Sequence, residues 1–133
     1  TPEQLTVAVS INKHNLTHEF IKESKVFAVS ILCEETPLTF IGTFGFKSGR
    51  DIDKFKGISF KLGETGAPII LDNTVSYLEA KATKGVDVGT HTLFIGEVVN
   101  ADMVEEHKAC MTYDYYYQIK GGKTPETAAT YTE

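Results

Sequence analysis

The stretch SINKHNLTHE, residues 10–19, decides how this chain folds, because an apolar strand runs into it and an amphipathic helix runs out of it. Upstream, apolar side chains at 5, 7, 9 and 11 alternate with small ones, which predicts a strand over residues 5–11. Downstream, Leu16, Phe20 and Ile21 share one side of a helical wheel, which predicts a helix from residue 16 to about Ser24 that covers a core edge. The start of a helix carries unpaired backbone N–H groups and the positive end of the helix dipole, so this junction can bind an anion.

Several side chains around this helix start are suited to a phosphate. They supply a positive charge, amide groups, a hydroxyl and an imidazole, and we list them as candidate phosphate ligands: Asn12, Lys13, Asn15, Thr17 and either His14 or His18. A structural alternative is that Asn15 or Thr17 only caps the helix while the other polar residues are solvated. The local pattern favours both interpretations equally.

A second polar concentration follows in FKSGRDIDKF, residues 46–55. A flexible backbone, a hydroxyl and two cations could hold a phosphate or the polar edge of a planar ring, which makes candidates of Ser48, Gly49, Arg50 and Lys54. Charge pairing among the basic residues and Asp51 and Asp53 is the alternative, and the pattern alone favours it.

The remaining pattern is that of a mainly β protein. Strands are expected over residues 25–33, 58–62, 75–83 and 91–99, with an extended edge at 67–70 and a turn at 85–89. A short helix over 38–44 is expected, with Thr36 as its N-cap, and a further helical turn over 51–55. The strand over 75–83 should have one solvent-exposed face, which carries Glu79. Gly96 should mark a β-bulge or a close approach of another part of the chain to the backbone. Such spacing predicts an antiparallel Greek-key barrel with short helical insertions.

The C-terminal segment, residues 113–133, differs from the core over residues 1–112. Aromatic residues at this density normally cover a surface, here the barrel or a partner subunit, and the tyrosines are Tyr113, Tyr115, Tyr116, Tyr117 and Tyr131. We therefore expect a homodimer.

Composition and motif content argue against several classes of protein. The 133 residues suit one domain, and no apolar run is long enough to cross a membrane. A net charge of −5 without a basic block argues against nucleic-acid binding. Cys33 and Cys110 lie far apart in the sequence, which suggests a reducing cytoplasm, with Cys33 a small buried hydrophobe. No metal site is expected, because His14 and His18 lack further ligands, and no hydrolase or Walker motif is present.

Three runs, SINKHNLTHEFI, FGFKSGRDIDKF and GTHTLFIGEV, together resemble the flavin reductase-like family of FMN-binding split barrels. The final run, MTYDYYYQIKGGKTPETAATY, is similar to the subgroup of flavoredoxins and the flavin domain of high-molecular-weight rubredoxins. The resemblance implies an FMN-binding split β-barrel that forms a homodimer and takes NAD(P)H as co-substrate. It also implies that family members begin with further strands that are missing from this chain.

Mapped onto this sequence, the resemblance implies a role for each candidate. The residues of 12–18 named above, with His18 as the histidine, would surround the FMN phosphate, and those of 48–54 would lie along the flavin or ribityl chain. His91 would meet the nicotinamide, although the residue taken alone better fits a turn histidine that makes one backbone hydrogen bond. The family usually has Gly-Asp-His where this chain has Gly89-Thr90-His91.

Three functions are therefore expected in decreasing order. The first is an NAD(P)H-dependent flavin reductase that passes hydride from nicotinamide to FMN, and electrons onward to an acceptor such as rubredoxin or a diiron flavoprotein. The second is a non-enzymatic FMN electron carrier of the flavoredoxin type. The third, a split barrel that has lost its cofactor, is disfavoured by the polar helix start.

Overall fold

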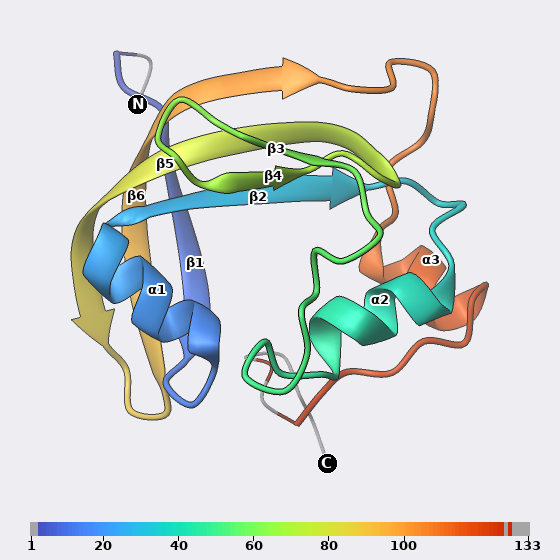
Figure 1. The fold of residues 1–133 in the computed structure, drawn as a ribbon, viewed down its shortest axis with the longest axis horizontal. Helices are drawn as coiled ribbons and strands as arrows, with labels where there is room; N and C mark the ends of the chain where they lie inside the picture. The colour runs from blue at the N-terminus through green and yellow to red at the C-terminus, as the bar shows by residue number, and fades with distance from the viewer. Residues whose placement is uncertain (1–2, 127, 129–133) are drawn as a thin grey trace.

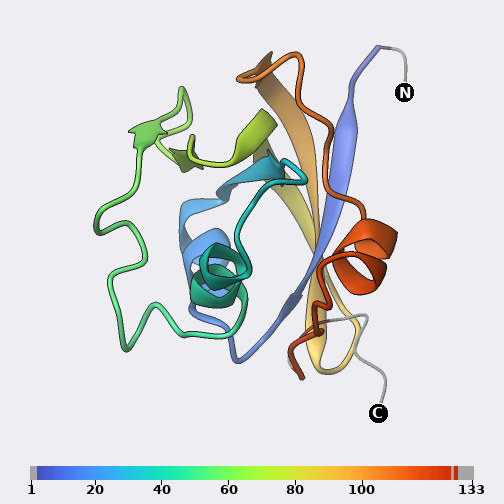
Figure 2. The same cartoon turned by 90° about the vertical axis from the view of Figure 1, so that its right-hand side faces the viewer.

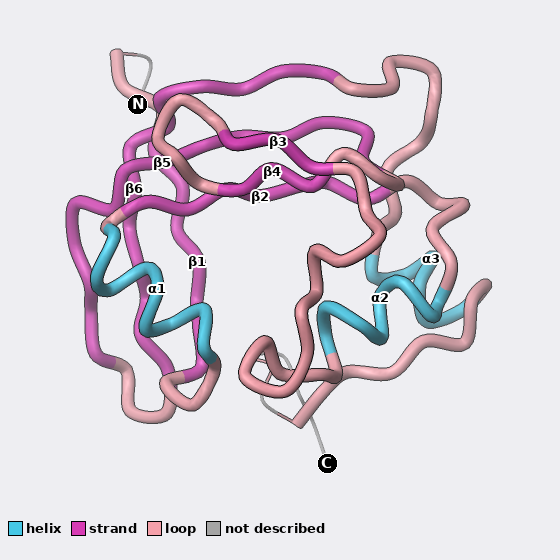
Figure 3. Tube along the Cα trace, viewed as in Figure 1, coloured by secondary structure: helices cyan, strands magenta, loops and turns pink. Residues whose placement is uncertain are grey.

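The computed structural model describes residues 3–126 and 128. In chain order, the elements are β1 (Thr6–Asn12), α1 (Leu16–Ser24), β2 (Val26–Leu32), α2 (Leu38–Gly45), β3 (Phe60–Leu62), β4 (Pro68–Ile70), β5 (Thr74–Asp87), β6 (His91–Met103) and α3 (Tyr113–Gln118). The described chain is mainly β, and its helices are short (Figure 3).

The main sheet has four antiparallel strands in the order β1-β6-β5-β2, and β3 and β4 form a separate hairpin. The long strands β5 and β6 bend, so the sheet curls into a half-barrel with α1 inside the curl (Figure 1 and Figure 2). β1 pairs with the last strand and not with β2, which is Greek-key order. The expected antiparallel architecture with short helical insertions is confirmed.

The core lies between α1 and the concave face of the sheet. Ile21, Phe27, Ala80 and Phe94 form its buried cluster. A Cβ on Gly96 would lie 2.9 Å from the Cβ of Ala80 and 3.0 Å from the Phe27 ring, so the expected close approach at this glycine is confirmed. The helical-wheel prediction holds for Ile21 but is wrong for Phe20, whose side chain is 59% exposed.

The start of α2 differs from the prediction by one residue. Pro37 is its N-cap, and the hydroxyl of the buried Thr36 donates instead to the Cys33 carbonyl, at 2.7 Å.

The helical turn expected over residues 51–55 is absent. Asp51 and Ile52 close turns on the Ser48 carbonyl, with N–O distances of 3.1 and 3.2 Å, and no helix follows.

The β5–β6 hairpin is longer than predicted. β5 continues through Gly85 to Asp87, so the turn covers only residues 88–90, and β6 continues to Met103. Gly85 is a local turn signal, but here it pairs with Phe94 across the hairpin. Cross-strand pairing therefore overrides the glycine.

The solvent-exposed face predicted for β5 is wrong at Glu79, although Lys81 on the same predicted face is exposed. The side chain of Glu79 has no exposed surface, because the chain between β3 and β4 covers it. Its carboxylate accepts hydrogen bonds from the Glu64 N–H (3.2 Å), the Thr65 N–H and hydroxyl (3.1 and 2.7 Å) and the Asn100 amide (2.8 Å). Burial alone raises the pKa of Glu79, but these hydrogen bonds outweigh it and lower the pKa.

The tyrosine-rich segment forms a helix that the sequence analysis missed. Thr112 caps α3, since its hydroxyl accepts from the Tyr115 N–H at 3.1 Å. Tyr116 is buried, and its hydroxyl donates to the Lys123 carbonyl at 2.6 Å. Tyr113 and Tyr117 remain 63% and 42% exposed. Tyr131 lies outside the described residues.

Candidate functional site

Two turns that are far apart in the sequence meet at one end of the curled sheet. The β1–α1 turn and the β5–β6 turn lie side by side, at the lower left of Figure 1. Asn12 pairs with His91 across the β1–β6 ladder, and the Lys13 N–H donates to the Thr90 carbonyl at 3.0 Å. The phosphate candidates and the nicotinamide candidate are therefore neighbours.

The start of α1 is not closed by its own side chains. Asn15 is the N-cap residue, but its side chain makes no capping hydrogen bond, and Thr17 is an exposed residue within the first turn of the helix. The structural alternative from the sequence was that Asn15 or Thr17 only caps the helix, and the absence of a capping hydrogen bond from Asn15 does not support it. Asn12 does have a structural role, because its buried side-chain oxygen accepts the His14 N–H at 2.9 Å and shapes the turn.

Lys13 makes an ion pair across the two turns. Its ammonium lies 2.7 Å from the Asp87 carboxylate, with side-chain exposures of 36% and 74%. The hydrogen bond from Lys13, followed by the one from the Gly89 N–H, lowers the pKa of Asp87. Asp87 was not among the site residues predicted from the sequence, although an Asp two residues before a glycine is a recognisable turn signal.

The two histidines of the site are both anchored by threonines of β6 or the turn before it. His18 Nε2 lies 2.7 Å from the Thr92 hydroxyl, and its ring lies 5.3 Å from that of Phe94. His91 Nδ1 lies 2.8 Å from the Thr90 hydroxyl. A neutral hydroxyl therefore orients His91 at the position where the family pattern usually carries a carboxylate.

The loop over residues 46–57 contacts α1, the helix whose start carries the candidate phosphate ligands. Arg50 forms an exposed bidentate pair with Glu19, with N–O distances of 2.6 and 3.4 Å. This hydrogen-bonded pairing raises the pKa of Arg50 and lowers that of Glu19. A Cβ at Gly49 would lie 3.2 Å from Leu16, so the loop packs against the first turn of α1. Arg50 is thus paired outside its own loop, unlike in the alternative based on local charge pairing.

Ser48 and Lys54 hold the loop in shape. The Ser48 hydroxyl accepts the Arg50 N–H at 3.1 Å, and the Lys54 ammonium donates to the Phe44 carbonyl at 2.8 Å, near the end of α2. Partial burial lowers the pKa of Lys54. Lys54 therefore connects this loop to α2, whereas Arg50 connects it to α1.

The arrangement suits a phosphate at the start of α1. It combines the N-terminus of α1, the Asn15 side-chain amide that makes no capping hydrogen bond, the Thr17 hydroxyl and the Lys13 ammonium within a few residues of chain. Donors of these kinds could hold a phosphate group. Within residues 3–126 and 128, no group of three His, Cys, Asp or Glu side chains could hold a metal ion, and no helix is long and apolar enough to span a membrane.

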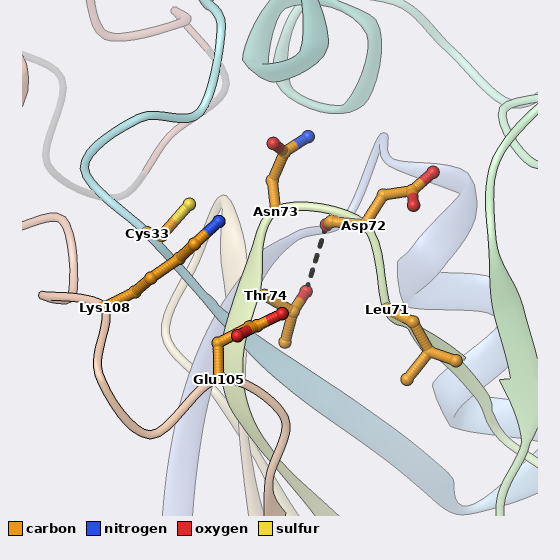
Figure 4. Close-up of a pocket in the computed structure, with 7 residues that line it drawn as sticks. All are labelled: Cys33, Leu71, Asp72, Asn73, Thr74, Glu105 and Lys108. Atoms are coloured by element: carbon orange, nitrogen blue, oxygen red, sulfur yellow. Dashed lines mark hydrogen bonds between the residues drawn. The ribbon is translucent and has the colours of Figure 1, made fainter.

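A separate cavity of about 170 Å³ lies at the opposite end of β5 (Figure 4). Its wall is polar, and it is formed by Cys33, Leu71, Asp72, Asn73, Thr74, Glu105 and Lys108. No candidate from the sequence analysis lines it. This cavity is therefore distinct from the site at the two turns.

A family model described as the flavin reductase like domain matches residues 2–120. The chain is 53% identical over 132 residues to a high molecular weight rubredoxin of Moorella thermoacetica, covering 99% of this chain and 57% of that protein. It is 46% identical over 133 residues to a ferric-chelate reductase (NAD(P)H) of Archaeoglobus fulgidus, covering 100% of this chain and 78% of that protein.

The fold is also that of a solved flavoprotein. The FMN-binding protein of Thermus thermophilus, solved with bound p-hydroxybenzaldehyde, superposes with a TM-score of 0.72 at 26% identity. The match covers 80% of this chain and 59% of the other. The resemblance to FMN-binding split barrels is thereby confirmed, and the chain spans little more than half the length of the rubredoxin relative and of this solved protein.

Proposed function

The chain belongs to the flavin reductase like domain family, and on that basis we propose that it is the FMN-binding part of an NAD(P)H-dependent flavin reductase. FMN, when bound, supplies the isoalloxazine ring that accepts a hydride from the nicotinamide. The names of the relatives support both halves of the proposal, since one is an NAD(P)H-dependent reductase and a solved neighbour binds FMN.

The observation that carries the proposal is the uncapped start of α1. Asn15 occupies the N-cap position without a capping hydrogen bond, beside the Lys13 ammonium and the exposed Thr17. We assign Lys13, Asn15 and Thr17 to the FMN phosphate. Asn12 shapes the turn that presents them, and His18, fixed by Thr92, lines it.

The loop over 46–57 is assigned to the flavin and ribityl side of the site. Arg50 reaches α1 through Glu19, and Gly49 lets the backbone approach Leu16 closely. Ser48 and Lys54 keep this loop in place through the Arg50 N–H and the Phe44 carbonyl. Their part in binding is thus to hold the backbone beside the ring.

His91 is assigned to the nicotinamide. It is the first residue of β6, opposite Asn12, and the Thr90 hydroxyl fixes its Nδ1 atom. A hydride transfer between two rings needs them held close and parallel, and needs no proton from the protein at the reacting carbon. His91 therefore positions the nicotinamide and moves no proton.

The electron acceptor we propose is a rubredoxin or a diiron flavoprotein. The relative with 53% identity carries the name rubredoxin, and this name also favours the second candidate function, an FMN electron carrier of the flavoredoxin type. NAD(P)H oxidation separates the two. FMN-loaded full-length protein should oxidise NADH or NADPH without any protein donor, and a protein that accepts electrons only from a protein donor would be a carrier.

The role of His91 has its own test. His91→Ala should lower kcat/KM for NAD(P)H by roughly 10- to 100-fold, as expected for losing one positioning contact. FMN affinity and reduction by dithionite should not change. His107→Ala removes an exposed histidine from the chain between β6 and α3 and serves as the matched control. Equal flavin bleaching by NAD(P)H in wild type and His91→Ala would remove His91 from the site.

We further propose a homodimer in the cytoplasm. Tyr113, Tyr117 and Ile119 of α3 and its C-cap are 63%, 42% and 67% exposed, and aromatic residues of this kind are enriched in subunit interfaces. Both cysteines are free thiols, which suits a reducing compartment. Tyr113→Ser with Tyr117→Ser should shift sedimentation toward the monomer. A double variant that stays dimeric would contradict an interface on α3.

A further inference from the structure

The two cysteines, which are far apart in the sequence, face each other in the fold. Cys33 follows β2 directly, and it forms an isolated antiparallel bridge with Cys110. The Glu34 N–H donates to the Ala109 carbonyl at 3.0 Å, and the Met111 N–H donates to the Leu32 carbonyl at 2.8 Å. These bonds flank the pair, so Cys33 and Cys110 form a non-hydrogen-bonded antiparallel pair.

This kind of pair has the spacing that a disulfide needs. Opposed residues in a non-hydrogen-bonded antiparallel pair have Cα atoms about 4.5 Å apart, with both side chains on the same face. A disulfide joins residues whose Cα atoms are roughly 4.4 to 6.8 Å apart. Both thiols are free in the structure. A bond between them therefore requires rotation of the side chains and little movement of the backbone.

The two thiols differ in their access to a reagent. Cys110 is exposed, whereas Cys33 is 1% exposed and its sulfur contacts the Thr36 hydroxyl at 3.6 Å. The cavity beside Cys33 offers one cation, Lys108, and two carboxylates, Asp72 and Glu105 (Figure 4). Burial shields the Cys33 sulfur from a reagent in solution. Cys110 is therefore the thiol that meets an oxidant first.

We propose that Cys33 and Cys110 form a reversible intramolecular disulfide, with a low-molecular-weight disulfide such as oxidised glutathione as the oxidant. The Cys110 thiolate attacks one sulfur of the small disulfide, which forms a mixed disulfide and releases one small thiol. Cys33 then loses its proton and attacks the Cys110 sulfur, which releases the second small thiol. Two protein thiols are thus oxidised as one small disulfide is reduced to two thiols.

The bond would connect the end of β2 to the segment that leads into α3. Cys110 stands two residues before Thr112, the N-cap of α3, and α3 carries the exposed Tyr113 and Tyr117. The oxidised protein should therefore resist unfolding better than the reduced protein, because the cross-link restricts the unfolded chain. This consequence does not depend on whether the protein binds a flavin.

The test is thiol chemistry on the native protein. Wild type incubated with oxidised glutathione should lose two hydrogen atoms in its intact mass, and a non-reducing peptide map should contain the Cys33–Cys110 linked peptide. Cys33→Ala should instead keep one glutathione on Cys110, because no resolving thiol remains. Cys110→Ala should stay unmodified. Dithiothreitol should restore both thiols in wild type and lower its melting temperature to that of the untreated protein.

The contrary results are equally specific. Wild type that retains a stable glutathione adduct on Cys110, or that links two chains through Cys110, would overturn the proposal. The proposal would also be overturned if both thiols of wild type stayed free under conditions that attach glutathione to Cys110 in Cys33→Ala. The peptide map of wild type decides the outcome by itself if a variant does not fold.

Discussion

Replacing Lys13 with alanine should weaken the binding of FMN and leave the binding of riboflavin unchanged. Riboflavin carries the same ring and ribityl chain without the phosphate, so it reports every contact except those to the phosphate. Lys13 lies in the turn before α1, two residues before Asn15, the N-cap residue whose side chain makes no capping hydrogen bond. A contact between its ammonium and the phosphate is therefore the only interaction that the two ligands should not share at this residue.

The size of the effect follows from the surroundings of Lys13. A charge-assisted hydrogen bond to a phosphate contributes about 1.5 to 3 kcal/mol. The Lys13 ammonium is already 2.7 Å from the Asp87 carboxylate, and its side chain is 36% exposed, so the phosphate competes with a carboxylate and with water. We therefore expect the lower end of this range, about 1.5 kcal/mol, which corresponds to slightly more than a tenfold increase in Kd.

Fluorescence titration of both flavins against the purified full-length protein measures this effect. Lys22→Ala is the matched control, because it removes the same charge from the other end of α1. Asp87→Asn should tighten FMN binding, since it removes the competing carboxylate while its side-chain oxygen still accepts the Gly89 N–H. An equal loss of riboflavin and FMN affinity in Lys13→Ala, or the same loss in Lys22→Ala, would refute the assignment of Lys13 to the phosphate.

Three further predictions concern the stability of the fold. Glu79→Gln should lower the free energy of unfolding by about 1 to 3 kcal/mol, because an amide cannot accept from all the donors around it. The lowered pKa of Glu79 stabilises the wild type above the ordinary value of 4.5, and this contribution is lost as the pH falls through the folded-state pKa. Denaturant titration from pH 3 to pH 7 should therefore show a steeper acid loss in wild type than in Glu79→Gln, and parallel curves would contradict this prediction. Gly96→Ala should destabilise by about 1 to 3 kcal/mol through overpacking, whereas Gly42→Ala in α2, where a Cβ meets nothing within 4 Å, should be neutral or stabilising. Tyr116→Phe should cost about 1 kcal/mol and expose the Lys123 amide to hydrogen exchange, since the tyrosine hydroxyl accepts that N–H at 3.0 Å; unchanged exchange would argue against this hydrogen bond.

Local sequence patterns predicted the elements well where one short segment decides its own structure. The alternation over residues 5–11 predicts β1, and the wheel from Leu16 predicts α1 to its last residue, Ser24. The patterns failed where a partner distant in sequence decides. Gly85 lies in a strand because β6 pairs with it, and Glu79 is buried because the chain before β4 supplies its donors.

The sequence alone determined the polar groups available at the start of α1 and, through three separate runs, the resemblance to a flavin-binding family. Only the tertiary structure decided which of these groups are neighbours. It placed His91 opposite Asn12, paired Lys13 with Asp87 and brought Cys33 to Cys110. The physical reason is that helix and strand periodicity are read from adjacent residues, whereas pairings across a curled sheet depend on how the whole chain closes.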